Sequence, residues 1–359
     1  MPITDGLSPA IAGHTSNVSG SENHIVAFGP QLRDAPYRVI RVLPDETGIN
    51  KVFDYLVPAG MLGEAMIGIG TMVRISLQGR RVGGWIVAVD VEPAMDVAKL
   101  KPIAKICSVG PGEAIISLGR WGSWRWWGKP AHFLRTASPS NNVRALPKIK
   151  ALDAALLPVS LSTDYAALLT KEVLVAASNA AGPTSLPERT VLFTDRQAGS
   201  DAPASVEGES RPVLLQLPPD SDLFGVVLEA ARYAGDRGVL VLAPSISVSI
   251  ALARRLRRAG APVALYPNDW ALACAGGCIV IGPRTAAWAP IEPGVIVVLD
   301  EHDEAYKEER IPAWHARDVA VERARRGAIP CILTSPIPSL EASELATLTT
   351  VPRDRKSVV

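Results

Sequence analysis

Residues 295–309 have the sequence VIVVLDEHDEAYKEE, and this stretch decides what kind of fold to expect. Four β-branched residues and a leucine are typical of a buried strand, and they lead directly into Asp300 and Glu301. Many nucleotide hydrolases use a buried strand that ends in adjacent carboxylates to hold magnesium and to orient a water toward a phosphate. If this chain hydrolyses a nucleotide, a phosphate-binding loop should therefore lie upstream.

Apolar runs alternate with amphipathic segments on both sides of this stretch. We expect strands at 212–218, 238–245, 262–267, 278–283, 294–301 and 330–336, and helices at 222–235, 247–260 and 316–327. Apolar strands separated by helices predict an α/β fold with a parallel, doubly wound sheet. Ligands of such sheets bind at the carboxyl ends of the strands. The polar residues that fall there are Ser245, Arg284, Asp300 and Ser335.

The segment after the first of these strands lacks the features of a phosphate-binding loop. Such a loop needs successive backbone N–H groups, glycines, a lysine and a Ser or Thr. Here Pro218 and Pro219 have no N–H to donate, and Asp220 and Asp222 add negative charge. No Lys or Arg lies between positions 211 and 232. Because one repulsive unit charge at contact is worth on the order of 1 kcal/mol in water, we expect this segment to bind a triphosphate poorly.

The N-terminal part of the chain predicts a small β-rich domain at 35–107. The segment 37–44, YRVIRVLP, alternates and ends at a proline, and the segment 70–89 predicts a strand, a tight turn and a second strand. Val73, Ile75 and Leu77 should share one face of that hairpin.

The region 108–210 gives weaker signals. One helix is expected at 113–137, closed by a proline, and its spacing should place Trp121, Trp124 and Trp127 on one face with Trp126 off it. We expect that face to be buried against the β domain; the alternative is an aromatic helix that stacks on DNA. A second helix is expected at 163–182, and 196–212 has the composition of a linker.

Composition limits the remaining choices. The formal net charge is +1 over 359 residues, so any nucleic-acid surface must be a local patch. No stretch is long and apolar enough to span a bilayer, and residues 1–34 predict a mobile tail rather than a signal peptide. Four cysteines are few for this length and favour a reducing cytoplasm. Cys274 and Cys278 lack a nearby His or a second pair, so we expect no metal site.

Three segments together resemble a known family. Residues 238–260, 279–309 and 314–342 are similar to consecutive helicase segments of primosomal protein N′, the PriA family of replication restart proteins. The resemblance covers residues 36 to about 130 and 211–348. It implies a superfamily 2 DNA helicase in which 211–350 forms a RecA-like first lobe. The family also has a winged-helix module nearby, which would fall at 140–210 but which the sequence itself does not establish. Mg-ATP is the cofactor of the family, whose zinc region, second lobe and C-terminal domain have no counterpart in this sequence.

The chain departs from the family at each element that handles ATP. The family sequence Gly-x-x-Gly-x-Gly-Lys-Thr aligns with residues 217–224, the carboxylate motif is one acidic residue shorter, and the Ser-Ala-Thr motif is replaced at 335–337. The degenerate loop comprises Leu217, Asp220, Asp222, Leu223 and Phe224, the last two standing at the Lys and Thr positions. The resemblance therefore implies a helicase-like lobe without hydrolysis, in which Asp300 and Glu301 are vestigial. Alternatively, this acidic pair caps the next helix or pairs with Arg310 or Arg317, and weak nucleotide binding without turnover stays open.

Residues 51–60 and the hairpin at 70–89 resemble the N-terminal domain of the family, which captures the 3′ end of a nascent strand at a stalled fork. An aromatic ring can stack on the last base, a carboxylate can accept from a base edge or the terminal hydroxyl, and cations can contact phosphates. From composition alone, Phe53 and Tyr55 are core residues, and the resemblance favours the pocket. The residues assigned to it are Phe53, Asp54, Tyr55, Gly79, Arg80 and Lys101.

Two further cationic positions allow both a structural and a DNA-binding interpretation. Arg284 lies in a segment that faces DNA in the family and is a candidate for a backbone contact. The run RRLRR at 254–258 is expected to be a solvated helix face, with a DNA contact as the alternative. Residues 351–359 are expected to be a translated adapter at the end of a fragment.

Three functions remain to be separated. The first is a replication restart protein that recognises fork DNA with a free 3′ end and recruits primosome proteins, a helicase loader and single-strand-binding protein, without unwinding. It would act in the cytoplasm and not at a membrane. The second is an active ATP-dependent 3′-to-5′ helicase. The third, a nuclease or restriction subunit of superfamily 2, is disfavoured by the β domain that precedes the lobe.

Overall fold

The computed structural model describes residues 37–63, 67–153, 155, 157, 169, 173–175, 211–219 and 221–350. The expected tail at 1–34, the acidic position Asp220 and the expected adapter at 351–359 lie outside the described residues. So do most of the expected helix at 163–182, most of the linker at 196–212 and much of the region 140–210, where a winged-helix-like module was considered.

The N-terminal domain is a five-stranded sheet in which every neighbouring pair of strands is antiparallel. Its strands are β1 (Tyr37–Pro44), β2 (Phe53–Pro58), β3 (Met72–Leu77), β4 (Arg80–Val89) and β5 (Lys105–Ser108), in the order β2-β1-β4-β3-β5. The sheet curls until the residues before β5 return to β2, because the Leu56 N–H donates to the Lys101 carbonyl at 3.0 Å and the Ile103 N–H to the Leu56 carbonyl at 2.9 Å. The interior is therefore closed on both sides.

The hairpin predicted at 70–89 is confirmed. Val73, Ile75 and Leu77 all belong to the interior cluster of the domain, as their alternation predicts. The turn between β3 and β4 places Gln78 and Gly79 at φ +48° and +79°. Positive φ at both central residues matches the right-handed twist of the flanking strands and favours glycine at the second position.

The single helix expected at 113–137 is wrong, because the chain forms two helices. They are α1 (Glu113–Arg125) and α2 (Pro130–Ala137). Trp127 has φ +53°, which no helix tolerates, and Pro130 occupies the first turn of α2, where its missing N–H costs nothing. A side chain at Gly128 would clash with Pro312 at 2.8 Å, so the break also lets the chain approach the 311–312 loop closely.

The expected burial of the tryptophan face is also wrong. Trp124 is 53% exposed and Trp127 is 90% exposed. Trp121 and Trp126 instead pack edge to face, with ring centroids 5.0 Å apart. Because the helix ends at Arg125, the spacing of 3.6 residues per turn no longer applies to Trp127.

The C-terminal domain is a seven-stranded parallel sheet, which confirms the expectation for this region. In spatial order β12-β6-β11-β10-β7-β9-β8, its strands are β12 (Thr347–Thr350), β6 (Val213–Gln216), β11 (Cys331–Ser335), β10 (Val295–Val298), β7 (Val239–Leu242), β9 (Ile279–Gly282) and β8 (Val263–Leu265). All six predicted strands are present, and β12 was not predicted.

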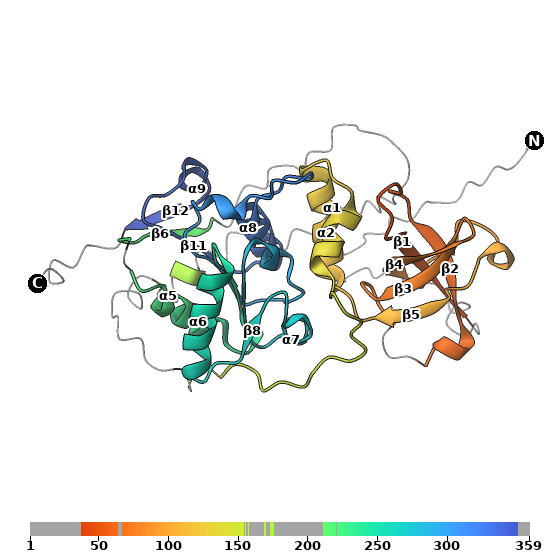
Figure 1. Ribbon diagram of the computed structural model, residues 1–359, viewed down its shortest axis with the longest axis horizontal. Helices are drawn as coiled ribbons and strands as arrows, with labels where there is room; N and C mark the ends of the chain where they lie inside the picture. The colour runs from red at the N-terminus through yellow and green to blue at the C-terminus, as the bar shows by residue number, and fades with distance from the viewer. Residues whose placement is uncertain are drawn as a thin grey trace, which may run out of the picture.

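Helices cover both faces of this sheet (Figure 1). The apolar residues of α5 (Leu223–Ala234) and α6 (Ile246–Arg258) pack on one face, and those of α7 (Trp270–Ala275) and α8 (Ala316–Gly327) pack on the other. The short helix α9 (Leu340–Leu345) leads into β12. Because both faces are buried, the strands are continuously apolar rather than alternating. Among the described residues, each helix is too short or too polar to pass through a bilayer.

Helices α1 and α2 lie between the two sheets (Figure 1) and pack on both. The Phe133 ring lies 5.0 Å from the Trp288 ring, and the Trp270 indole N–H donates to the Ala137 carbonyl at 2.7 Å. On the other side, the Trp85 indole N–H of β4 donates to the Ser138 hydroxyl at 2.8 Å. The β domain and the parallel domain are thus joined through one continuous apolar cluster.

Candidate nucleic-acid interface and nucleotide-binding region

Phe53 and Tyr55 point into the closed interior of the β domain. Both belong to its interior cluster, and Tyr55 is only 4% exposed. The Tyr55 hydroxyl donates to the Ser76 carbonyl at 2.9 Å, close to the turn that holds Gly79. Burial raises the pKa of the Tyr55 phenol, so it stays a neutral donor. Tyr55 is therefore a core residue that fixes the position of the β3–β4 turn, whereas Phe53 is only partly buried at the rim.

Asp54 lies on the opposite, outer face of β2, because side chains alternate along a strand. It is paired across the ladder with Arg41, whose Nε and Nη2 donate to its two carboxylate oxygens at 2.7 and 3.3 Å. The Ala94 N–H adds a third donor at 3.1 Å, and the Asp54 side chain is 7% exposed. A carboxylate offers about four lone-pair sites, so three donors leave little acceptor capacity for a nucleic acid.

The remaining three residues of the assigned pocket are exposed. Arg80 and Lys101 are solvent-exposed, and nothing lies within 4 Å of where a side chain at Gly79 would begin. The backbone of Lys101 pairs with Leu56 on β2. The structure thus connects Tyr55 to the turn and Lys101 to β2, and it separates the Asp54 carboxylate from the Phe53 and Tyr55 rings by the thickness of the sheet.

The loop between β6 and α5 is closed by an acidic cap. The Asp222 carboxylate accepts from the Phe224 N–H at 3.2 Å, which caps α5, and receives both Nη atoms of Arg255 at 2.7 Å. The Arg255 hydrogen bonds hold the pKa of Asp222 below its usual range. A helix N-terminus attracts an anionic ligand, but here a carboxylate of the chain itself takes that place.

The other loop residues are apolar and packed. Leu217 is 3% exposed, and its N–H donates to the Ser335 carbonyl at 3.0 Å. Leu223 and Phe224 pack on the cluster beneath α5, and the Arg255 guanidinium lies 4.4 Å from the centre of the Phe224 ring. Arg255 is thus already bound to Asp222 and Phe224. The described residues of this loop do not fit a magnesium-bound triphosphate.

Asp300 stands at the carboxyl end of β10 with φ +49°, and its N–H donates to the Thr334 hydroxyl at 3.1 Å. Burial raises the pKa of its carboxyl group, His302 lowers it, and Asp303 raises it further. Asp300 is half-buried at the edge where ligands of parallel sheets bind.

Glu301 is fully buried and accepts three hydrogen bonds from within the chain. One carboxylate oxygen accepts from Arg317 Nη1 at 2.9 Å and the Ser339 hydroxyl at 2.8 Å, and the other accepts from the Ser339 N–H at 2.8 Å. Of the two arginines considered as partners, Arg317 is the one that pairs with it. In this arrangement Glu301 anchors α8 and α9 to the end of β10, and it faces no solvent in which a water could be activated.

Neighbouring polar residues complete the same edge. His302 Nδ1 lies 2.8 Å from the Ser335 hydroxyl, and Gln216 Nε2 donates to the Pro336 carbonyl at 3.4 Å. The carboxyl ends of β6, β10 and β11 are therefore cross-linked to one another by side chains. No group of three or more His, Cys, Asp or Glu side chains within the described ranges is placed to hold a metal ion.

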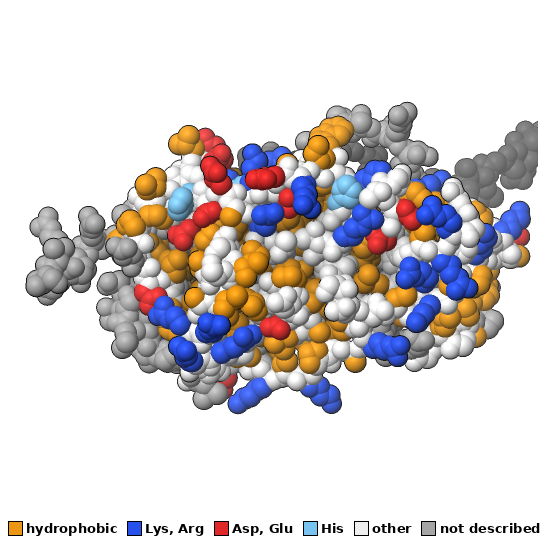
Figure 2. All heavy atoms as spheres, in the orientation of Figure 1, with side chains coloured by type: hydrophobic (Ala, Val, Ile, Leu, Met, Phe, Trp, Pro, Cys, Tyr) orange, Lys and Arg blue, Asp and Glu red, His pale blue; other side chains and the backbone are white. Residues whose placement is uncertain are grey.

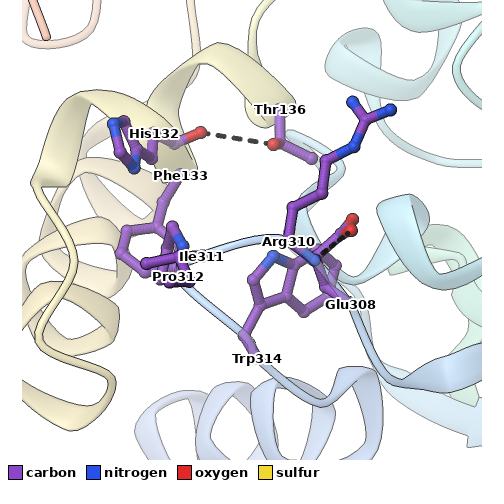
Figure 3. Close-up of a pocket in the computed structure, with 8 residues that line it drawn as sticks. All are labelled: His132, Phe133, Thr136, Glu308, Arg310, Ile311, Pro312 and Trp314. Atoms are coloured by element: carbon purple, nitrogen blue, oxygen red, sulfur yellow. Dashed lines mark hydrogen bonds between the residues drawn. The ribbon is translucent and has the colours of Figure 1, made fainter.

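Arg284 is engaged at the other side of this edge. Its Nε donates to Glu308 at 3.3 Å and its Nη1 to the Ala305 carbonyl at 3.3 Å. Just beyond Glu308, a hollow of about 130 Å³ lies between α2 and the 308–314 loop. Figure 3 shows His132, Phe133 and Thr136 of α2 facing this loop. The hollow is small and belongs to the contact between the domains, not to the strand-end carboxylates.

Sequence reasoning missed the two arginines that neutralise the candidate carboxylates. The pairing of Arg41 with Asp54 can be predicted only if the register of β1 against β2 is known, because the two residues lie opposite each other. Arg255 belongs to the run expected to be a solvated helix face, and its four arginines are indeed exposed. Its partner Asp222 could be found only from the packing of α6 beside α5. Arg257 likewise pairs with Asp269.

The described residues thus form an antiparallel β domain with an exposed cationic turn, followed by a parallel sheet that helices cover on both faces. Residues 38–139 match the sequence model of the 3′DNA-binding domain (3′BD) of PriA. The match spans the curled sheet together with α1 and α2, so these elements form one recognisable unit.

Curated relatives point to the same proteins. The replication restart protein PriA of Treponema pallidum is 32% identical over 131 residues, 33% of this chain and 20% of that protein. The probable replication restart protein PriA of Mycobacterium tuberculosis is 27% identical over 308 residues, 83% of this chain and 44% of that protein. The chain is thus similar to PriA proteins, both in the matched 3′DNA-binding domain and over 83% of its length. It spans less than half the length of these relatives.

Among solved structures, similarity was found to Saccharomyces cerevisiae Dbp5, solved bound to Nup159, Gle1, IP6 and ADP. It has a TM-score of 0.31 and 13% identity, and it covers 39% of this chain and 43% of that one. At this level the likeness has no bearing on fold or function.

Proposed function

We propose that this chain acts in replication restart by recognising branched DNA with a free 3′ end, and that its parallel domain is a RecA-like first lobe of superfamily 2 that does not hydrolyse ATP. The observation that carries the proposal is the match of residues 38–139 to a 3′DNA-binding domain. The exposed cations at the β3–β4 turn and beside β2 give that domain a place to receive a phosphate backbone.

In this proposal, the rim of the β domain receives the end of the strand. Phe53 is partly exposed and supplies a ring on which the last base stacks. Gly79 has no side chain, so the strand can approach the turn closely, while Arg80 and Lys101 contact the terminal phosphates. Tyr55 acts from beneath by holding the turn through Ser76. Asp54 lies on the other face of β2, so the terminal hydroxyl has to pass the edge of this strand to reach it, and there the hydroxyl donates to the carboxylate in place of the Ala94 N–H.

The proposal for the parallel domain rests on the filled partners of its acidic residues. Asp222 occupies the start of α5, where a phosphate would have to bind, and Glu301 is buried against Arg317. Mg-ATP is therefore no cofactor of these residues, and the family's zinc falls outside them. As partners of the DNA-bound chain we propose other primosome proteins, a helicase loader and single-strand-binding protein, all in the cytoplasm.

The end-recognition proposal is tested with matched forks that differ only at the 3′ terminus, one free and one blocked. We expect tighter binding to the free end, and we expect Phe53→Ala to reduce that preference while duplex binding persists. A matched control is Tyr37→Ala at the opposite end of the β1–β2 pair, away from the turn. Equal affinity of the wild-type chain for the two forks contradicts the proposal.

The absence of hydrolysis is tested by DNA-stimulated phosphate release. We expect no turnover above background, with Asp300→Asn indistinguishable from wild type. Turnover that Asp300→Asn abolishes establishes the alternative, an active ATP-dependent 3′-to-5′ helicase. Because the chain spans less than half the length of its relatives, phosphate release should also be measured with any longer form of the protein.

A further inference from the structure

The outer face of the β domain carries cations that recognition of a strand end does not use. Arg74 on β3 lies directly opposite Lys105 on β5, and Arg81 on β4 lies opposite Ser76, the next outward-facing residue of β3. All three cations are exposed, and no carboxylate in the described residues pairs with them. Like charges directly opposite each other in an antiparallel pair are destabilising, so this arrangement lowers the stability of the domain unless an anion binds there.

The sheet itself separates these cations from the Phe53 ring, on which the last base is proposed to stack. Val73 and Ile75, the neighbours of Arg74, point into the closed interior together with Phe53 and Tyr55. Arg74 therefore points outward. Figure 2 shows Lys and Arg side chains gathered over β3 and β5. A ligand on this face cannot be the base that stacks at the rim.

A second group of cations lies in the segment that follows α2. This segment is tied to the end of β5, because the Val109 N–H donates to the Val143 carbonyl at 2.7 Å and the Val143 N–H donates to the Ser108 hydroxyl at 2.8 Å. Farther along, the Leu152 N–H donates to the Gly277 carbonyl at 2.7 Å in the parallel domain. The segment is therefore held at both ends, against one domain and then the other.

Between these two ties the chain is basic. Arg144, Lys148 and Lys150 are exposed, and residues 138–152 include no Asp or Glu. Six residue steps separate the first of these cations from the last, so they span at most ~20 Å. This distance corresponds to about six steps of a duplex at ~3.4 Å per step.

We propose that these six cations form one surface, the basic strip, that binds the sugar–phosphate backbone of the double-stranded DNA arm leading to the captured 3′ end. The strip comprises Arg74, Arg81, Lys105, Arg144, Lys148 and Lys150. It contains only Arg and Lys and no aromatic residue, so it suits phosphates rather than unstacked bases. This inference rests on the proposed function, since the β domain sets which DNA arm reaches the strip.

The test uses the salt dependence of fork binding by the whole 359-residue chain. Each phosphate contact contributes about 0.9 to the slope of log affinity against log salt for duplex DNA. We expect the triple variant Arg74→Gln, Arg81→Gln and Lys105→Gln to lower that slope by about 2 to 3. The charge-conserving variant Arg74→Lys with Arg81→Lys should keep the wild-type slope. An unchanged slope in the triple glutamine variant overturns the proposal.

A matched control removes three exposed cations from the parallel domain, through Arg237→Gln, Arg254→Gln and Arg258→Gln. We expect this variant to keep the wild-type slope. If its slope falls as much as that of the triple glutamine variant (the strip variant), the location of the cations does not matter and the proposal is overturned. Unfolding of the strip variant gives a second readout. Because like charges are relieved, we expect its stability to equal or exceed that of wild type.

The end pocket and the basic strip can fail independently. The strip variant should keep the ratio of affinities for free and blocked 3′ ends, because the Phe53 and Gly79 rim is untouched. Shortening the duplex arm below about six base pairs should lower the slope of the wild-type chain, and should lower that of the triple glutamine variant by less, because only Arg144, Lys148 and Lys150 of the strip remain in it. If the wild-type chain binds free and blocked 3′ ends equally, the proposed function is wrong but the basic strip is not contradicted. If the slope depends on arm length equally in both chains, the basic strip is contradicted.

Discussion

The β3–β4 turn of the N-terminal domain and the carboxyl edge of the parallel sheet both hold the charged residues expected to bind a ligand, but the two regions differ in what those residues already bind. At the turn, Arg80 is exposed next to a glycine with open space beside it, and Lys101 is exposed beside β2. At the sheet edge, Glu301 accepts three hydrogen bonds while fully buried. A polar group whose partners are all within the chain stabilises the fold, and one whose partners are water can exchange them for a ligand.

Asp54 is the residue that fits this contrast least well. It belongs to the proposed end pocket by position, yet its side chain is only 7% exposed and accepts three hydrogen bonds, as Glu301 does. The two carboxylates therefore provide the sharpest comparison between the regions, because one is proposed to bind a ligand and the other is not.

The largest expected effect concerns the buried pair at the sheet edge. Glu301→Ala leaves Arg317 buried without its main counter-charge, and breaking a buried pair in this way costs about 3–5 kcal/mol. Urea unfolding followed by circular dichroism measures the change. The matched control is Arg38→Gln, which removes one partner of the half-exposed Arg38–Asp90 pair and should cost less than about 1 kcal/mol. Equal losses in the two variants would show that Glu301 is not a structural anchor.

The next effect concerns DNA. Asp54→Ala should reduce the preference for a free over a blocked 3′ end by about 1–3 kcal/mol, the usual worth of one specific contact. Because Arg41 loses its partner as well, the double variant Arg41→Gln with Asp54→Asn serves as the control for fold and local charge. A preference that survives Asp54→Ala at full strength removes this residue from the pocket and leaves Phe53 as its main determinant.

A smaller effect tests the role given to Tyr55. Tyr55→Phe keeps the ring and deletes the hydrogen bond to the Ser76 carbonyl, so unfolding should become easier by about 1 kcal/mol. If Tyr55 only supports the turn, the preference for a free 3′ end should fall slightly, through a looser Gly79. Loss of DNA binding without loss of stability would instead mean that the hydroxyl contacts the nucleic acid directly.

The strands of the parallel sheet could be predicted from sequence because both of its faces are buried, which leaves continuous apolar runs such as 295–299. The short elements β5, α7, α9 and β12 were not predicted, since four to six residues carry too little periodicity. The break between α1 and α2 was missed because Pro130 is compatible with the first turn of a new helix, and the positive φ of Trp127 has no sequence signal.

The site residues were predictable by position but not by their partners. That Asp300 and Ser335 fall at neighbouring strand ends follows from chain order alone, whereas the pairing of Arg41 with Asp54 depends on strand register. The pairing of Arg255 with Asp222 depends on how α6 packs beside α5. Partners from distant parts of the chain decide whether a charged residue is free to bind, and they are set by tertiary packing.

The smallest expected effect separates the two functions of Asp222, which caps α5 and pairs with Arg255. Asparagine is as good a cap as aspartate, so Asp222→Asn isolates the charge from the cap. The pKa of Asp222 is lowered in the folded chain, chiefly by its hydrogen bonds to Arg255. Its charge therefore stabilises the fold above the unfolded value, near pH 4, and this contribution is lost as pH falls through the lower folded value.

Unfolding of wild type and Asp222→Asn across pH 2–7 measures this contribution. Because the side chains of the pair are 49% and 58% exposed, the difference between the two chains should reach only a few tenths of a kcal/mol above about pH 4 and vanish in acid. Asp222→Ala should lose about 1 kcal/mol more at every pH, because it also removes the cap. A gain in nucleotide affinity in either variant would mean that the aspartate alone kept phosphate away from α5, and the apolar residues Leu223 and Phe224 would then matter less than the charge.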